Sequence, residues 1–451
     1  MSIKTPVVSP ARRSRWLINR TFTLLSIGQA ISNMGDFVYS TTLLIWVFAL
    51  GGSAAAVSGV LVAEYVPSFA LGPLAGVFVD RWNRLHTMLA SDLARMCIAL
   101  LPLCVPGFLR LPAIYISVFF ISCISRFFMP ARSALTQVIV AQEQQGQAAS
   151  VGQVTQALAI VVGPALASPL YFLVGPVIAV LMNAASFGVS ALFLWRIRVP
   201  EIDLVPSKSR TDALEQAEQP GGARAVINEM LAGFALVLKT RILLIVTLLA
   251  MIAMFGAGAI NSLEIVYISQ RLHANPDLYG YLSAASGLGT LIGAVICGLL
   301  VKRIPSRFML TGSLILVGGG IVLYALQTWI ILAIVLSFLL GFPQAGINVG
   351  LAPILMQATP RRFMGRVQAV FMTATYAASL LAIALCGVLG TFLPAYQLLL
   401  MGGILLALAG IFGWRALPPA DPPEAEATTP KPEAQVLALD SRQKDRTEYT
   451  L

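Results

Sequence analysis

Charged residues are scarce in this sequence. Asp, Glu, Lys and Arg make up 11% of its 451 residues, whereas about a quarter is usual for a soluble globular domain. Hydrophobic residues make up 57%. This balance excludes an ordinary globular enzyme and indicates a protein whose surface faces lipid rather than water.

Residues that bind metals or form disulfides are also few. Five cysteines occur singly within apolar segments, with no CxxC pair: Cys97, Cys104, Cys123, Cys297 and Cys386. They are expected to be small buried hydrophobic residues. Two histidines are too few for a catalytic or metal centre, and the sequence has no GxxxxGK[ST] loop. We therefore expect no cofactor, no metal, no catalytic residue and no direct use of ATP.

Long apolar runs are abundant. Charged residues cluster at intervals and leave stretches of about 20 apolar residues, enough for an α-helix to cross a hydrocarbon core of about 30 Å. The first predicted spans are 21–50, 56–79, 88–107, 113–134, 149–170 and 174–195. The second set is 241–268, 278–301, 308–327, 330–355, 366–390 and 395–414. The predicted fold class is an all-α membrane protein with twelve transmembrane helices in two pseudo-symmetric six-helix bundles.

Basic residues predict the orientation. Of 30 lysines and arginines, 26 fall on one side of the predicted spans, which is typical of the cytoplasmic side. The net charge of +10 therefore indicates membrane orientation and not nucleic-acid binding. The first apolar run, 22–50, is too long for a cleaved signal peptide. We expect a multi-pass protein of the cell inner membrane with both termini in the cytoplasm.

Polar segments divide the chain. The predicted domains are a cytoplasmic tail, the first bundle, a cytoplasmic linker, the second bundle and a disordered cytoplasmic tail, covering 1–20, 21–198, 199–240, 241–416 and 417–451. Within the linker, the helical spacing of Val226, Met230, Phe234 and Val237 predicts an amphipathic helix on the inner leaflet.

The two predicted bundles resemble each other weakly. Residues 76–81 align with 298–303, each stretch at the inner end of a second span, and 147–156 matches 365–375 in position. Such a repeat is typical of a transporter whose two bundles rock about a central site. The domain plan therefore predicts alternating access.

A motif follows the second span. Gly76, Asp80, Arg81 and Arg84 form a G-x-x-x-D-R-x-x-R pattern, which resembles the signature between helices two and three of the major facilitator superfamily. The resemblance implies that Asp80 and Arg81 take part in a charge relay that gates the cytoplasmic mouth. We add Asp92 to this gating set, with a structural pair to the arginine three residues later as the alternative.

A second resemblance concerns the fifth span. Gly163 and Pro164 lie in a run of small residues, similar to the Gly-Pro pair of antiporters of the superfamily. The stretch 126–164 is similar to the macrolide-efflux-like branch, whose members export macrolides, siderophores or related amphiphiles. The resemblance thus implies a drug/proton antiporter that works in the direction of export.

The first span has one polar face. Gln29, Asn33, Asp36 and Ser40 lie at offsets of 4, 7 and 11 residues, on one side of a helix that should line the cavity. Asp36 falls near the middle of the membrane, where loss of hydration favours the neutral carboxyl and makes proton exchange possible. The alternative is a permanent ion pair between Asp36 and Arg126.

Further charged residues fall within predicted spans. Glu64 and Glu264 are candidate second proton-coupling acids or sites for a cationic substrate, with solvation in an outer vestibule as the alternative. Arg126 is placed like an arginine that modulates the carboxylate in antiporters of the superfamily, or is a fixed partner of Asp36 or Asp92. Uncharged polar residues complete the predicted cavity, unless they only join helices: Gln153, Gln156, Asn261, Gln344, Asn348, Gln368 and Thr375.

Together these features predict proton-coupled export of a small amphiphilic molecule, such as a drug, macrolide or siderophore-like compound, and a part in multidrug resistance. The expected partners are the substrate, protons and the lipid bilayer, with no nucleic acid and a monomeric chain. An uncoupled facilitator or lipid or siderophore flippase is one alternative. A membrane sensor that transports nothing, and acts through its linker and tail, is the other.

Overall fold

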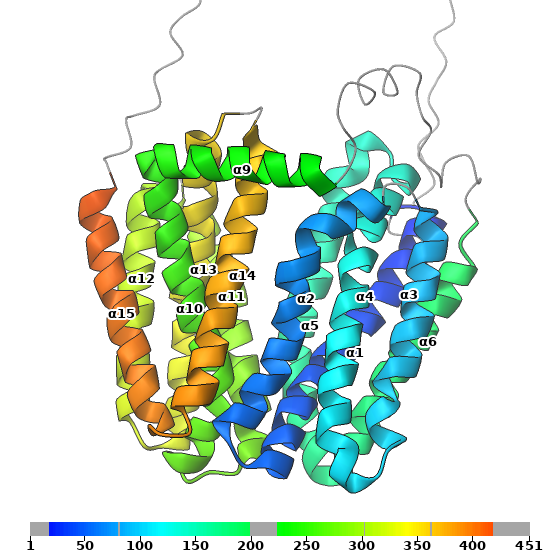
Figure 1. The fold of residues 1–451 in the computed structure, drawn as a ribbon, viewed down its shortest axis with the longest axis horizontal. Coiled ribbons are helices and arrows are strands. Elements are labelled where there is room, and N and C mark those ends of the chain that lie inside the picture. The colour runs from blue at the N-terminus through cyan, green and yellow to red at the C-terminus, as the bar shows by residue number, and fades with distance from the viewer. Residues whose placement is uncertain (1–17, 80–81, 199–222, 302, 361–362, 418–451) are drawn as a thin grey trace, which may run out of the picture.

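The computed structural model describes most of the chain as helices. The described residues are 18–79, 82–198, 223–301, 303–360 and 363–417, with backbone alone for 73–78 and 223–230. Every regular element within these ranges is helical, because backbone groups in a hydrocarbon core have to hydrogen-bond within their own segment. Figure 1 shows two groups of helices side by side, the first half of the chain in blue to cyan and the second in green to orange.

Twelve long helices in the described residues form the two halves. The first half contains α1 (Arg20–Gly51), α2 (Ala54–Val79), α3 (Arg84–Ala99), α4 (Arg110–Ile139), α5 (Gln145–Val174) and α6 (Pro176–Trp195). The second half contains α10 (Arg241–Gln270), α11 (Tyr279–Leu300), α12 (Ser306–Leu326), α13 (Ile330–Ala358), α14 (Met364–Leu389) and α15 (Ala395–Ala416). Eleven of them are long and apolar enough to cross a membrane, and α3, with 16 residues, is the exception. The predicted fold class is confirmed.

The third predicted span, 88–107, is wrong in its second part. Helix α3 ends at Ala99, and the chain continues in two 3-10 turns, η1 (Leu101–Leu103) and η2 (Gly107–Leu109). Pro102 lacks a backbone N–H and its ring crowds the preceding turn, which favours the end of α3 and the change to a 3-10 turn at this point. The other helix ends lie within five residues of the predicted ones.

The two halves repeat one packing pattern. In the first half α1 packs against α5 and α6, α4 against α2 and α3, and α3 against α6. In the second half α10 packs against α14 and α15, α13 against α11 and α12, and α12 against α15. The halves meet through two equivalent pairs, α2 with α14 and α5 with α11. The weak sequence repeat therefore corresponds to pseudo-symmetric bundles.

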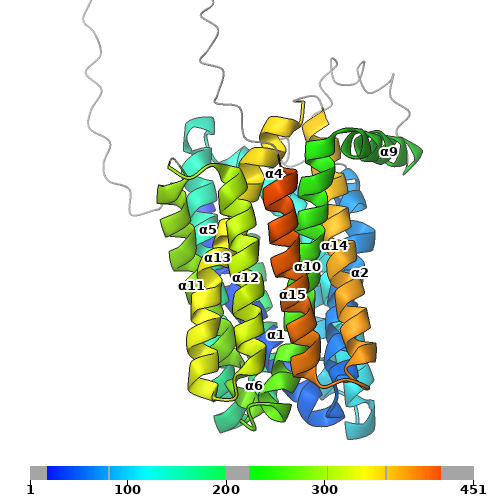
Figure 2. The same cartoon turned by 90° about the vertical axis from the view of Figure 1, so that its left-hand side faces the viewer.

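An additional helix, α9 (Ala223–Lys239), precedes the second half and lies across the ends of the long helices (Figures 1 and 2). It packs against α10 and α14. Gly233 lies directly on α14, since a Cβ atom there would be 2.8 Å from the carbonyl oxygen of Arg366. We call this side of the molecule the α9 end and the other side the opposite end.

The apolar face predicted for this helix is partly wrong. Val237 is 3% exposed and packs among residues of α10 and α14, whereas Phe234 is 51% exposed. The two side chains therefore lie on different faces, because α9 contacts protein on one side only. Its exposed apolar face consists of Leu231, Phe234 and Leu238. The side chains of Val226 and Met230 lie outside the described part.

The halves touch at the opposite end and separate toward the α9 end (Figure 1). The hydroxyls of Ser58 on α2 and Ser262 on α10 form a hydrogen bond of 2.9 Å between their Oγ atoms. A Cβ atom on Gly387 would lie 2.7 Å from the Cβ of Ser58, and one on Gly280 would collide with the carbonyl oxygen of Pro164. A side chain at Gly280 would meet the backbone of α5, and one at Gly387 would meet the side chain of Ser58, so glycine allows the close contact at both places.

A hydrophobic core surrounds this junction. The largest cluster of buried apolar side chains joins both halves near the opposite end, and Val57 and Val60 on α2, Leu263 on α10 and Ile383 on α14 are among its members. Burying a side chain of this size, rather than leaving it exposed to water, stabilises the closed junction by about 1.5–3 kcal/mol. The opposite end is therefore closed by packing as well as by hydrogen bonds.

Candidate functional site

A cavity of about 930 Å³ lies mainly within the first half. Its lining reaches from Phe22 and Gln145, at the starts of α1 and α5 at the α9 end, to Tyr279 at the start of α11 near the opposite end. Asn261, Tyr279 and Ser283 contribute from the second half. Because the halves separate only toward the α9 end, a ligand would reach this cavity from that end.

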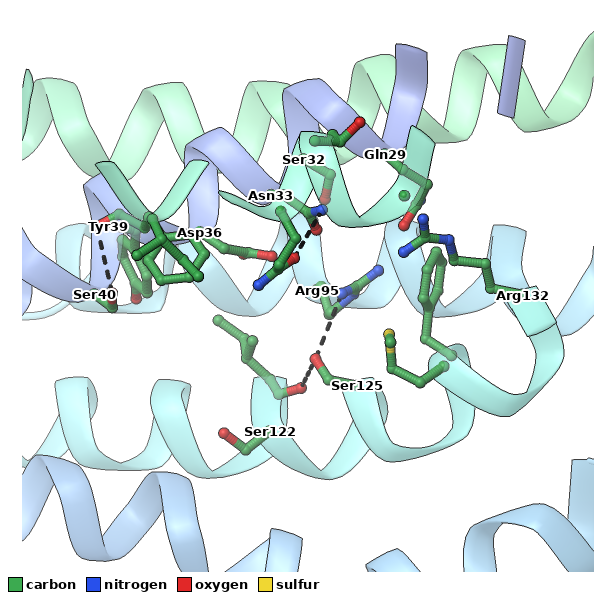
Figure 3. A pocket seen from close by; sticks show the side chains of 18 of the residues that line it. Gln29, Ser32, Asn33, Asp36, Tyr39, Ser40, Arg95, Ser122, Ser125 and Arg132 are labelled. Atoms are coloured by element: carbon green, nitrogen blue, oxygen red, sulfur yellow. Dashed lines mark hydrogen bonds between the residues drawn. The ribbon is translucent and has the colours of Figure 1, made fainter. Parts of the chain in front are cut away.

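The polar face of α1 lines this cavity. Gln29, Asn33, Asp36 and Ser40 all belong to its wall, and Figure 3 shows them along one side of the helix. Gln29 Nε2 donates to Ser190 Oγ at 3.3 Å, so this amide also joins α1 to α6. Ser40 Oγ donates to the carbonyl oxygen of Phe37, 3.4 Å away in its own helix. The period of the α-helix accounts for the common face.

Asp36 is partly exposed to the cavity. The amide of Asn183 on α6 faces its carboxyl, and the buried Nδ2 of that amide has no hydrogen-bond partner in the described part of the chain. Among described cations, Arg95 acts most strongly on Asp36, and Figure 3 shows Asn33, Asp36 and Arg95 converging. The alternative of a permanent ion pair with Arg126 is wrong, since Asp36 forms no ion pair among the described residues.

Arg95 is a site residue that the sequence did not reveal as such. It forms an ion pair with Asp92, one turn earlier in α3, and both side chains are buried. Its guanidinium stacks on Phe128 and Phe187 at 4.3 and 4.5 Å from the ring centroids, an arrangement that stabilises a buried cation. Arg95 Nη1 also donates to Ser125 Oγ at 3.4 Å.

This pair corrects the role given to Asp92. A gating residue at the mouth should reach water, but Asp92 is fully buried between α3, α4 and α6, so the structural alternative holds. One of its oxygens, Oδ2, has no hydrogen-bond partner in the described residues. Of the motif residues, Asp80 and Arg81 lie outside the described residues, Gly76 is described by its backbone alone, and Arg84 begins α3.

Glu64 and Arg126 face the same cavity from α2 and α4. Arg126 forms no ion pair among the described residues, so neither Asp36 nor Asp92 is its fixed partner in this conformation. Its Nε is buried without a hydrogen-bond partner among the described residues. Arg132, a third arginine in the lining, was not predicted because it follows Pro130 near a helix end.

Helix α5 supplies the wall next to α1, against which it packs. Gln153 and Gln156 both line the cavity, and Asn33 Nδ2 donates to Gln156 Oε1 at 3.2 Å. Gly163 packs against Phe37 so closely that a Cβ atom would collide with it. Pro164 lines the cavity, and its carbonyl lies against α11. The Gly-Pro pair thus lies where α5 contacts both halves.

A second cavity of about 440 Å³ lies in the second half. Glu264 and Gln344 line it, and Asn261 lines both cavities. Glu264 is 9% exposed and accepts a hydrogen bond from Tyr324 Oη at 3.2 Å. Solvation in an outer vestibule, the alternative reading of this residue, is therefore wrong.

Three residues expected in the cavity line neither of the two. Asn348 and Gln368 are absent from both walls. Thr375 is 7% exposed, and its hydroxyl donates to the carbonyl oxygens of Phe371 and Met372 in its own helix, each at 2.9 Å. Placing these residues in the cavity is wrong for this conformation, because helix rotation cannot be read from spacing alone.

Comparison with known proteins decides the family. The family model described as Major Facilitator Superfamily matches residues 25–260 and 246–446, which together cover most of the chain. The chain belongs to the Major Facilitator Superfamily. Members of a superfamily share a fold more reliably than a substrate, so the substrate has to be argued from the site.

Relatives in this superfamily include transporters and exporters. The uncharacterized MFS-type transporter YfiS of Bacillus subtilis (strain 168) is 27% identical over 396 residues, 86% of this chain and 91% of that protein. Macrolide efflux protein A of Streptococcus pyogenes is 23% identical over 66% of this chain and 71% of that protein. The putative bacilysin exporter BacE of Bacillus subtilis is 33% identical over 41% of this chain and 45% of that protein. The resemblance to the macrolide-efflux-like branch is confirmed.

Solved structures share the architecture. The nucleoside transporter NupG matches with a TM-score of 0.69 at 12% identity, over 88% of this chain and 99% of that one. A bacterial homologue of the iron transporter ferroportin, in an inward-facing state, matches with a TM-score of 0.66 at 14% identity, over 88% and 98% of the two chains. At this identity the likeness shows the fold alone.

Proposed function

We propose that this transporter exports a small amphiphilic molecule from the cytoplasm in exchange for protons. The observation that carries the proposal is a cavity with carboxyl groups in its wall, Asp36 and Glu64, that is reached from the α9 end and closed at the opposite end. The distribution of basic residues supports a cytoplasmic location for the α9 end and both termini. The structure then corresponds to an inward-open state in the cell membrane.

Asp36 is the principal proton carrier in this proposal. In the inward-open state the cavity admits water, so an ionised carboxylate is hydrated and can lose its proton to the cytoplasm. Closing the cavity around that charge is costly unless a proton or a substrate compensates it. Protonation therefore favours the return without substrate, and deprotonation accompanies capture of substrate.

Arg95 provides the second part of this mechanism. It already compensates Asp92, and its charge also acts on Asp36. When Asp36 is ionised, one guanidinium serves two carboxylates, and when Asp36 is protonated, Arg95 serves Asp92 alone. Protonation of Asp36 therefore weakens the attraction between α1 and α3. In this way the proton changes the relative stability of the two conformations.

The relatives support the direction and the chemical class. Two of them carry names that describe export, of macrolides in one case and of bacilysin in the other. A large cavity that combines amides with apolar side chains suits an amphiphile of that kind. We therefore propose export of macrolide-like compounds, with drug resistance as the expected phenotype of the cell.

The test is uptake of a labelled macrolide into everted membrane vesicles, with and without a proton gradient. The wild-type chain should accumulate it only with the gradient, and Asp36→Asn should lower this accumulation by about 5-fold to 150-fold, the usual range of coupling between two sites. Glu143→Gln is the matched control, because this acid lies on an exposed turn outside both cavities. Equal uptake with and without the gradient would contradict proton coupling and support a facilitator, whereas no uptake of any compound would support a sensor.

A further inference from the structure

The second cavity contains a buried carboxyl that no cation compensates. Glu264 projects from the last third of α10, toward the opposite end, and its side chain forms no ion pair with any described lysine or arginine. Its Oε1 accepts from Tyr324, and Oε2 has no hydrogen-bond partner among the described residues. An acid at membrane depth without a cationic partner is costly, so its presence calls for a ligand or a proton.

The walls around this carboxyl are mostly apolar. Helices α10, α11, α12, α13 and α15 surround the cavity, and α5 closes it from the first half. The apolar lining includes Ile260, Val317, Ile321, Leu340, Ile347 and Leu406. A few polar groups stand among them, Ser337 and Gln344 on α13 and Thr290 on α11. One charge within an apolar wall matches a molecule with one positive group and a large apolar body.

The second cavity adjoins the first. Ile160, Asn261, Tyr279 and Ser283 belong to both linings, so a ligand held at Glu264 stays in contact with the cavity that contains Asp36. At about 440 Å³ it is within the usual size of a small-molecule site. The two compartments differ in chemistry, since the first contains several charges of both signs and the second contains Glu264 alone among the described residues.

We infer that the cavity of the second half is a binding site for lipophilic cations, with Glu264 as the group that receives the positive charge. This inference rests on the proposed function in one respect, namely that ligands enter the two cavities. It assigns Glu264 to substrate recognition, while Asp36 carries the proton. Tyr324 is then a positioning residue, because its hydroxyl holds one carboxylate oxygen and leaves the other for the ligand.

Two ions of the same shape and opposite charge test this inference. Tetraphenylphosphonium and tetraphenylborate should be titrated against the purified full-length protein in detergent, with empty micelles as the blank. The wild-type protein should bind the cation more tightly than the anion. Glu264→Gln keeps the size of the side chain and removes its charge, so it should weaken binding of the cation by about tenfold or more and leave binding of the anion unchanged.

Two further variants locate the site. Ala257→Phe fills the second cavity without touching the first, since Ala257 lines only the former, and should weaken binding of the cation to a similar extent. Thr375→Val is the control, because this residue lies outside both cavities, and should bind the cation as the wild type does.

The inference is overturned if the wild type does not bind the cation, if Glu264→Gln binds it unchanged, or if Ala257→Phe does. Because this experiment measures binding without a gradient, its failure is distinct from loss of proton coupling in Asp36→Asn vesicles.

Discussion

The two halves of this transporter share a helix arrangement and differ in charge. In the first half Asp92 and Arg95 are buried as an ion pair in α3. The offset of 222 residues that aligns 76–81 with 298–303 places Leu314 and Val317 at the equivalent positions of α12, and both are buried in an apolar cluster. The comparison teaches that the second half packs the equivalent helix without a charged pair, so the buried ion pair is a feature of the first bundle and not a requirement of the shared fold.

The largest expected effect concerns that pair. Arg95→Met should lower the free energy of unfolding by about 3–5 kcal/mol, because it leaves Asp92 buried without a cation. The double variant Asp92→Leu, Arg95→Met imitates the second half and should unfold at the wild-type denaturant concentration or above it. Chemical unfolding in detergent micelles measures both. If the single and the double variant are equally unstable, the unpaired charge of Asp92 is not the cause of the instability.

Packing between the halves gives the second prediction. Gly280→Val should force α11 away from Pro164 and Ser168 of α5, since the amide of Gly280 donates to Ser168 Oγ at 3.0 Å and no side chain fits between them. The closed end should then open. The reporter is a cysteine in place of the buried Ser262, in a chain without the native cysteines. With Gly280→Val, this cysteine should react with an impermeant maleimide several times faster than without it. Gly402→Val meets open space and should leave the rate unchanged. Equal rates in both variants would contradict closure by this contact.

Helix α9, which packs mainly on α10 and α14 of the second half, gives a smaller effect. Val237→Ala should cost about 1.5–2.5 kcal/mol of stability, because it removes two methyl-sized groups from a buried cluster of α10 and α14. Phe234→Ala should leave stability nearly unchanged, since that ring faces outward, and should weaken contact of α9 with lipid. Fluorescence quenching by brominated lipids of a tryptophan placed at position 231 detects the latter. Similar losses of stability would show that both residues face protein.

The smallest effect separates two polar residues on the corresponding helices α5 and α14. Gln153 lines the first cavity, whereas Thr375 lines neither. Thr375→Val should change macrolide uptake and stability by little, within about 0.5 kcal/mol for the latter. Gln153→Leu should reduce uptake several-fold with normal expression. A larger loss in Thr375→Val would mean that α14 rotates into the cavity in another state.

Sequence patterns were sufficient for some parts of the site and not for others. The spacing of Gln29, Asn33, Asp36 and Ser40 within one helix predicted a common face, because that geometry depends only on the helical period. The alternative of an ion pair between Asp36 and Arg126 could not be judged from the sequence, since the two residues lie on different helices, α1 and α4, and their separation depends on how those helices pack. Glycines are common in apolar runs, so the sequence does not distinguish Gly280 and Gly387 from the others. Their role at the junction is seen only from the atoms that they contact.

The amino-acid sequence by itself determined the number of long helices, most of their lengths and the weak repeat, because hydrophobic length acts within a segment. Only the tertiary structure decided that Arg95 acts on Asp36, that Glu264 has an apolar compartment of its own, and that the halves meet at one end. These features arise between segments far apart in the chain, and their physical cause is the mutual rotation and tilt of packed helices, on which a periodic pattern carries no information.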